Sequence, residues 1–197
     1  MAGRKPKFTE EILLKKASQL FWKKGYFNCS TRDLILELNI NKGTLYNTFG
    51  SKKELFIRCL AYLEDDWFEQ MENKIATTDT PYQELVAIFN SICDESENQR
   101  NLGCILGNTL IETVNKEPEL QKLTTEYLTR LKNLFKLGIS KAIEKKEIKT
   151  LSSPQEIALI LISLWNGIQV TKRLPYKSEE LKWLIDHHLN DIKSKSN

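Results

Sequence analysis

Residues 30–55 read STRDLILELNINKGTLYNTFGSKKEL and contain two short stretches that favour helix, 31–38 and 42–49. A Ser or Thr can cap the start of the first stretch, and Ser51 can cap a longer segment that follows the second. Only residues 39–41 separate the two stretches. Two helices of about eight residues joined by about three are typical of a helix-turn-helix unit.

Longer helical segments flank this unit. Apolar residues recur at helical spacing on both sides of it, and Pro81, Pro118 and Pro154 open further segments at a helix position that needs no N–H. No alternation of apolar and polar residues indicates a strand. We therefore expect an all-α fold of about nine helices, with a three-helix head and a helical-bundle body. The expected segments are 9–24, 31–38, 42–49, 51–75, 81–98, 104–115, 118–146, 154–173 and 177–192.

Charge divides the chain more clearly than composition does. Apolar residues make up 41% of its 197 residues and charged residues 28%, which is ordinary for a globular protein. Residues 1–53 hold eleven Lys and Arg against four Asp and Glu, a net charge of +7, whereas residues 54–197 hold eighteen against twenty-two, a net of −4. A basic head favours a polyanionic partner. Arg4, Lys5 and Lys7 form a basic arm that either contacts this partner or only raises solubility.

Location and redox state are also constrained by the sequence. The N-terminus lacks the apolar stretch of a secretory signal, and the most apolar segment, 157–170, is 14 residues long and includes polar residues. A membrane helix needs roughly 18 to 20 apolar residues. We expect a cytoplasmic protein that has no membrane span and no disulfides.

Enzymatic chemistry has no visible apparatus. The four cysteines, Cys29, Cys59, Cys93 and Cys104, form no CxxC pair, and no Ser/His/Asp set or phosphate-binding glycine loop is present. The adjacent histidines at 187–188 point about 100° apart on a helix and cannot share a metal on one face. We expect no catalysis, no metal and no cofactor.

The head resembles the DNA-binding domain of TetR-family transcriptional regulators. That family reads roughly T-x-x-D-I-A, then S-K-G-T-L-Y-x-H-F, then S-K-x-x-L, and residues 30–34, 41–49 and 51–55 match this pattern. The resemblance implies a DNA-binding domain at 1–50 and an effector-binding and dimerisation domain at 51–197. It also implies double-stranded DNA as a partner and a homodimer.

The resemblance places the DNA contacts mainly on the second short helix. Asn47 can pair with adenine, Tyr46 can lie beside a sugar and Lys52 can bind phosphate. Thr48 stands where the family usually has a histidine and leaves a shorter hydroxyl contact. Asn39 replaces the usual turn glycine and tolerates the left-handed conformation. The expected DNA-binding residues are Thr31, Arg32, Lys42, Gly43, Thr44, Tyr46, Asn47, Thr48 and Lys52.

The body contains aromatic residues on several helices, which either line an apolar cavity or pack in the core. The resemblance implies a pocket for a small-molecule effector but does not say which side chains line it. The candidates are Tyr62, Trp67, Phe89, Cys104, Asn108, Tyr127 and Trp165.

Cys104 begins a segment that resembles the G-C-x-L-x-N sequence of one branch of the family, which includes repressors of electrophile and oxidant defence. A cysteine at a helix N-terminus has a lowered pKa and a reactive thiolate. The alternative is a buried packing cysteine.

Segment 154–173 is apolar on nearly every side, so its second face meets either a neighbouring helix or a partner. The resemblance implies a dimer through the last two helices, including Leu181, Leu184, Ile185 and Leu189. The alternative is a wholly internal helix.

We therefore expect a dimeric regulator, a repressor released from a palindromic operator by a small apolar or electrophilic effector. An architectural or adaptor protein that binds DNA without an effector is the alternative, and a body without a cavity would favour it. A helical ligand carrier without DNA binding is a third possibility that the head disfavours.

Overall fold

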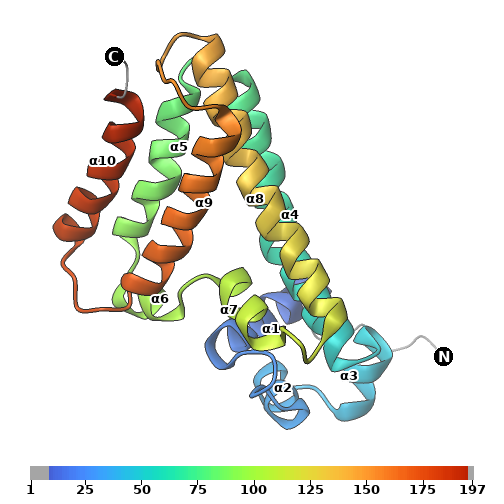
Figure 1. Ribbon diagram of the computed structural model, residues 1–197. Coiled ribbons are helices and arrows are strands. Elements are labelled where there is room, and N and C mark those ends of the chain that lie inside the picture. Colours follow the sequence, from blue (N-terminus) through green and yellow to red (C-terminus); the bar gives the residue numbers. More distant parts are fainter. Residues whose placement is uncertain (1–8, 195–197) are drawn as a thin grey trace.

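The computed structural model describes residues 9–194, which are helical throughout apart from short connections (Figure 1). The predicted all-α class is confirmed. None of the described helices is long and apolar enough to cross a membrane. The elements are α1 (Glu10–Lys24), α2 (Thr31–Leu38), α3 (Lys42–Phe49), α4 (Lys52–Thr77), α5 (Pro81–Asn90), the 3-10 turn η1 (Ser91–Asp94), α6 (Glu97–Leu102), α7 (Ile105–Thr113), α8 (Pro118–Glu144), α9 (Pro154–Thr171) and α10 (Ser178–Ser194).

The segment expected as one helix over 81–98 differs from the prediction. Helix α5 ends at Asn90, η1 follows, and α6 starts a new helix. Ser96 and Gln99 form a capping box, in which each side chain accepts a hydrogen bond from the other residue's backbone N–H. The capping box supplies partners for N–H groups at the start of a helix that have no acceptor within the helix. It therefore stabilises the start of a separate helix at α6.

Helices α1 to α3 form the head, with α2 and α3 crossing as the predicted helix-turn-helix unit (Figure 1). Leu34 and Leu38 of α2 pack with Leu45 and Phe49 of α3, and all four are buried. Asn39 adopts the expected left-handed conformation, with φ 52° and ψ 46°. These contacts fix the angle between the two short helices.

The head core does not end at the head. It continues into the start of α4 at Leu55 and Phe56, and it also includes Ile105 and Leu106 of α7 and Leu120 of α8. Apolar residues from three later helices are therefore buried against α1 to α3. This shared core ties the orientation of the head to the body.

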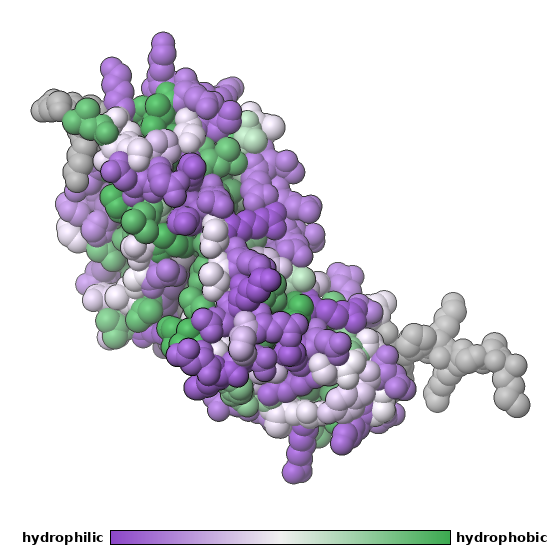
Figure 2. Space-filling model, turned by 45° about the vertical axis from the view of Figure 1, so that its right-hand side comes forward, coloured by the Kyte–Doolittle hydropathy of each residue, from purple (hydrophilic) through white to green (hydrophobic). Residues whose placement is uncertain are grey.

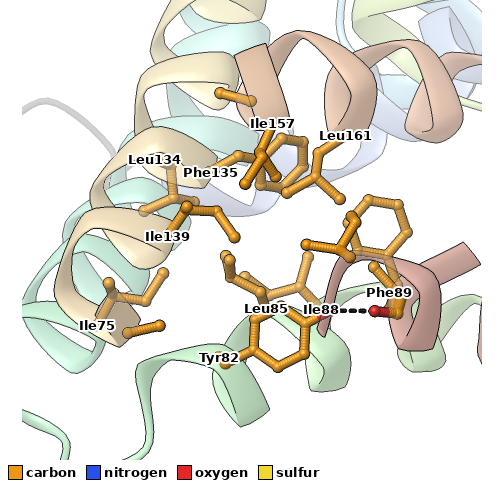
Figure 3. Close-up of a cluster of buried hydrophobic side chains, with 14 of the residues drawn as sticks. Ile75, Tyr82, Leu85, Ile88, Phe89, Leu134, Phe135, Ile139, Ile157 and Leu161 are labelled. Carbon is orange, nitrogen blue, oxygen red and sulfur yellow. Dashed lines mark hydrogen bonds between the residues drawn. The ribbon is translucent and has the colours of Figure 1, made fainter. Parts of the chain in front are cut away.

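A second core lies in the body among α4, α5, α8, α9 and α10. Figure 3 shows side chains of these helices pointing toward one another, among them Ile75, Leu85, Phe135 and Leu161. All four are buried, and the rings of Phe89 and Phe135 lie 5.4 Å apart. This packing is what holds the far ends of the long helices together.

Two long helices, α4 and α8, lie side by side and connect the head to the body (Figure 1). At 1.5 Å per residue, the 26 residues of α4 span about 39 Å. Arg130 of α8 donates two hydrogen bonds of 2.8 Å each to the Glu72 carboxylate of α4. These contacts hold the two helices together along the stretch between the head and the body.

Candidate DNA interface and ligand cavity

One outer side of α3 carries most of the predicted DNA-binding residues. Lys42, Gly43, Thr44, Tyr46 and Asn47 are exposed, on the side of the helix away from its buried leucine and phenylalanine. Asn41 caps the first turn of α3, because its side-chain oxygen accepts a hydrogen bond of 2.8 Å from the Thr44 N–H. The structure thus gathers these five residues on a surface free to meet DNA.

The remaining predicted DNA-binding residues surround this surface. Arg32 is exposed on the first turn of α2, and Thr31 beside it is half-buried. Thr48 is half-buried on α3, and its backbone oxygen accepts a hydrogen bond of 3.1 Å from Arg58. The Lys52 ammonium lies 4.5 Å from the centre of the Tyr26 ring, at the start of α4. Arg4, Lys5 and Lys7 lie outside the described residues.

Two acidic groups of the head, Asp33 and Glu10, are engaged in ion pairs. Asp33 accepts hydrogen bonds from Ser30 and pairs with Lys24 at 2.7 Å. These contacts hold the pKa of Asp33 well below its usual range. Glu10 pairs with Arg58 in the same way. The exposed side of α3 carries no acidic residue to repel a phosphate.

A cavity of about 460 Å³ lies between α4, α5, α7, α8 and α9 and reaches the end of α1. Of the seven residues predicted to bind a ligand, Trp67, Cys104 and Trp165 line it. Phe68 and the Trp22 ring add further aromatic surface. Its size is within the range of pockets that bind drug-sized molecules.

The other four predicted ligand residues do not line this cavity. Phe89 is fully buried in the body core, and Tyr127 donates a 2.9 Å hydrogen bond from its hydroxyl to Asp65. Asn108 bonds the Leu102 backbone oxygen and Arg173 instead. Tyr62 falls on another side of α4, because the cavity-lining residues of that helix follow a three-to-four-residue repeat that begins at position 63.

Of the two interpretations of Cys104, a raised pKa favours the buried packing cysteine over the reactive thiolate. Cys104 is the N-cap of α7, and its sulfur accepts a 3.4 Å hydrogen bond from the Gly107 N–H, which lowers the pKa. Burial raises the pKa by more than this contact lowers it. The pKa values of Cys29, Cys59 and Cys93 are raised by burial as well, so no thiol of the four is activated.

Sequence reasoning missed the polar residues of the cavity. Glu64 lines it between apolar neighbours on α4, and burial together with the nearby Asp65 raises its pKa to about 7. Gln169 and Lys172 of the last turns of α9 also line it, and the Lys172 ammonium pairs with Glu95 at 2.6 Å. A carboxylate inside the apolar stripe of a helix was the signal available for Glu64.

Polar contacts join the cavity wall to the head. The Trp22 Nε1 group of α1 donates a 3.1 Å hydrogen bond to the backbone oxygen of Gly103. At the end of α7, the Glu112 carboxylate accepts hydrogen bonds of 2.8 and 2.7 Å from the backbone N–H groups of Tyr26 and Phe27. Helix α7 thus contacts the cavity at one end and the α1–α2 connection at the other.

Comparisons with known proteins agree with this architecture. Residues 13–59 match the family of bacterial regulatory proteins of the tetR family, and residues 81–188 match the tetracyclin repressor-like C-terminal domain. YezE of Bacillus subtilis strain 168, an uncharacterized HTH-type transcriptional regulator, is 28% identical over 151 residues, which cover 74% of this chain and 76% of YezE. The HTH-type transcriptional repressor DhaR of Mycobacterium sp. strain GP1 is 25% identical over 177 residues, covering 86% and 84%.

A solved structure shares the fold. A variant of the TetR family transcriptional regulator CifR, complexed with a 26 bp double-strand operator DNA, superimposes with a TM-score of 0.82 at 17% identity and covers 95% of this chain and 98% of its own. The two family matches together include both the helix-turn-helix unit and most of the body. The chain therefore belongs to the TetR family of DNA-binding transcriptional regulators.

Proposed function

We propose that the chain acts as a homodimeric repressor that a small molecule releases from a palindromic operator. Residues 1–50 bind DNA, and residues 51–197 bind the effector and form the dimer. One observation carries this proposal: α4 begins at the head with Lys52 and lines the cavity from Leu63 to Lys74. A ligand that displaces this helix moves the head attached to its first turn.

The two heads of a dimer read successive major grooves only at a fixed separation. Adjacent half-sites lie about 34 to 36 Å apart, so a modest rotation of α4 spoils the fit of one head. Selection of bound sequences from a random DNA pool tests the proposal, and a palindromic operator is the expected result. Affinity for that operator should fall by about 10³ to 10⁵ between about 50 and 200 mM salt if six to ten phosphates are neutralised. Salt-insensitive binding would contradict it.

An exposed apolar face on α9 supports the dimer. Leu159, Ile160 and Val170 are 62%, 54% and 59% exposed, and Trp183 on α10 is 66% exposed. Figure 2 shows apolar side chains gathered on the body, whereas polar ones dominate the head. A patch of this kind on a soluble chain favours a partner surface. The two-fold packing of this face against its copy is the dimer that we propose.

The dimer residues predicted on the last helix need correction. Leu181, Ile185 and Leu189 are buried within the same chain, and Leu184 packs against the body core. The hydroxyl of Tyr82 also donates a hydrogen bond to the backbone oxygen of Leu189. These residues face the body because the apolar stripe of α10 covers the body core. We therefore propose that the dimer seam is formed by the exposed faces of α9 and α10.

The size of the dimer in solution tests this assignment. Ile160→Glu should give folded monomers that bind operator DNA poorly, because one head has half the phosphate contacts and no two-fold register. Ile111→Glu is the matched control, since Ile111 is apolar and 77% exposed but lies on α7. Light scattering should report a dimer for the control alone. A dimeric Ile160→Glu protein would place the seam elsewhere.

The open cavity favours a ligand-released regulator over an adaptor that binds DNA without an effector. An adaptor has no use for about 460 Å³ of aromatic-lined space, which costs packing energy in its empty form. The raised pKa of Cys104 favours a ligand that binds without forming a covalent bond.

A further inference from the structure

The cavity contains a carboxylate that has no partner. Glu64 lines the cavity, and it forms no hydrogen bond or ion pair with any residue in the part of the chain that the structure describes. Its neighbours on the cavity side of α4 are Leu63, Trp67 and Phe68. A carboxylate held in apolar surroundings is costly unless a proton or a cation compensates it. The cavity therefore lacks a cation that would compensate the ionised Glu64 carboxylate.

The positive groups of the cavity are already paired. The Lys172 ammonium lies 2.6 and 2.9 Å from the two oxygens of Glu95. The Lys74 ammonium lies 2.5 Å from Glu84. Neither lysine is available to neutralise Glu64 or to hold an anionic ligand without breaking an ion pair. When Glu64 is ionised, the lining thus carries one negative charge more than it carries positive ones.

One further unpaired acceptor and the aromatic rings point to the same ligand chemistry. The Gln169 Oε1 atom is buried, lines the cavity and accepts no hydrogen bond from the described residues. It is an acceptor and needs an N–H or O–H donor. Trp67 and Trp165 line the cavity with aromatic rings, and the faces of such rings attract a cation.

From this arrangement we propose that the cavity binds a protonated organic amine with an apolar, ring-sized body, whose ammonium group pairs with Glu64. The body of the ligand lies among the aromatic side chains. The inference rests on the proposed function, because it names the class of effector that would release the operator. The cavity volume of about 460 Å³ admits a molecule of two or three fused rings with a short amine arm.

Three probes with one naphthalene body and different head groups test this proposal. They are 2-(1-naphthyl)ethylamine, 2-(1-naphthyl)ethanol and 1-naphthaleneacetate, which present an ammonium, a hydroxyl and a carboxylate. Calorimetric titration of the full-length protein at neutral pH, without DNA, should show the amine binding about 10-fold or more tighter than the alcohol, and the carboxylate weakest. Equal or tighter binding of the alcohol or the carboxylate would overturn the proposal. So would the absence of amine binding up to about 1 mM.

Two variants assign the charge to Glu64. Glu64→Gln should weaken the amine about 10-fold and change the alcohol by less than about 2-fold, since only the charge is removed. Glu69→Gln is the matched control because Glu69 is an exposed carboxylate on the same helix. It should leave the affinity for all three probes unchanged. An unchanged amine affinity in Glu64→Gln would overturn the assignment, and the melting temperature of each variant shows that it is folded.

A parallel measurement separates this inference from the proposed function. Operator binding by the same samples is followed by fluorescence anisotropy, with and without the amine. Amine binding that leaves the operator bound supports the ligand class and contradicts release by this site. Steep, salt-dependent operator binding without any amine binding contradicts the ligand class and leaves DNA recognition intact.

Discussion

The head and the cavity differ in how their residues come together. The predicted DNA surface of α3 is built by five exposed residues within one run of eight, Lys42–Phe49, which is held by contacts to α2 and to the start of α4. The cavity is built by single residues from several helices, including Trp22 of α1 and Gln169 of α9. A surface built by one stretch of sequence can be recognised as a motif. A cavity depends on which face each of the surrounding helices turns toward it. The two regions meet through α4 and α7.

The largest expected effect concerns the body core on which the cavity depends. Phe135→Ala should lower the free energy of unfolding by about 3 to 5 kcal/mol, because Phe135 is fully buried between the rings of Phe89 and Trp165. Urea unfolding followed by circular dichroism measures this loss. Ile111→Ala, on an exposed side chain, should change it by less than about 0.5 kcal/mol. A loss as small as the control's would mean that the core rearranges.

The contact between head and body has an intermediate effect. Glu112→Ala removes the acceptor of two backbone N–H groups, at Tyr26 and Phe27, and should destabilise the protein by about 1 to 3 kcal/mol. Glu112→Gln keeps one acceptor oxygen and should lose less. Operator release by a cavity ligand should weaken in Glu112→Ala if α7 transmits the signal. Unimpaired release would leave α4 as the only connection that matters.

The loss of a base contact in the head should change the free energy of DNA binding by a similar amount, but only at one base-pair position. Asn47→Ala should relax the preference at one base pair by about 1 to 3 kcal/mol, since an exposed asparagine on α3 can pair bidentately with adenine. Tyr46→Ala is the comparison, because a phosphate or sugar contact weakens all sequences alike. Binding to a set of single-base operator variants measures both. An unchanged preference in Asn47→Ala would remove it from the reading surface.

The difference between the two regions also explains what the sequence could predict. The helix-turn-helix unit, its left-handed turn at Asn39 and its buried leucines follow from local propensity and spacing. Three of the predicted ligand residues line the cavity. Tyr62 does not, because it lies one position before Leu63, the first residue of α4 that lines the cavity. The sequence left two interpretations of Cys104 open, because the helix N-terminus that would lower its pKa is visible in the sequence and the burial that raises it is not. Burial depends on distant helices and cannot be inferred from neighbours in sequence.

A pH-dependent effect follows from Glu64. Its folded pKa is about 7, above the value of 4.5 for an unperturbed carboxyl group, so the folded chain binds more protons than the unfolded chain between these values. The free energy of unfolding should therefore fall as the pH rises through this window, and the contribution is lost above pH 7. Asp65 strengthens the effect by repulsion, and Glu64 in turn contributes to the raised pKa values of Cys104 and Tyr127.

Removal of the carboxyl group tests this linkage. Glu64→Gln should show a flatter decrease of stability between about pH 5 and pH 8 than the parent protein. Glu69→Gln, with its exposed carboxyl group, should keep the parent's slope. Urea unfolding at several pH values provides the comparison. Parallel curves for all three proteins would show that Glu64 titrates normally.

The smallest expected effect is a difference in alkylation rate between a thiol in the cavity and a thiol outside it. Cys104 lines the cavity, whereas Cys93 does not, although both are half-buried and both pKa values are raised. Alkylation at neutral pH should therefore modify Cys104 no faster than Cys93. Saturating 2-(1-naphthyl)ethylamine should slow Cys104 a few-fold and leave Cys93 unchanged, because a bound ligand covers only the cavity wall. Mass spectrometry of peptides after timed alkylation measures both rates in one sample. Modification of Cys104 well ahead of the other three thiols would instead restore a reactive, electrophile-sensing cysteine, and slowing at both sites alike would mean that the amine acts outside the cavity.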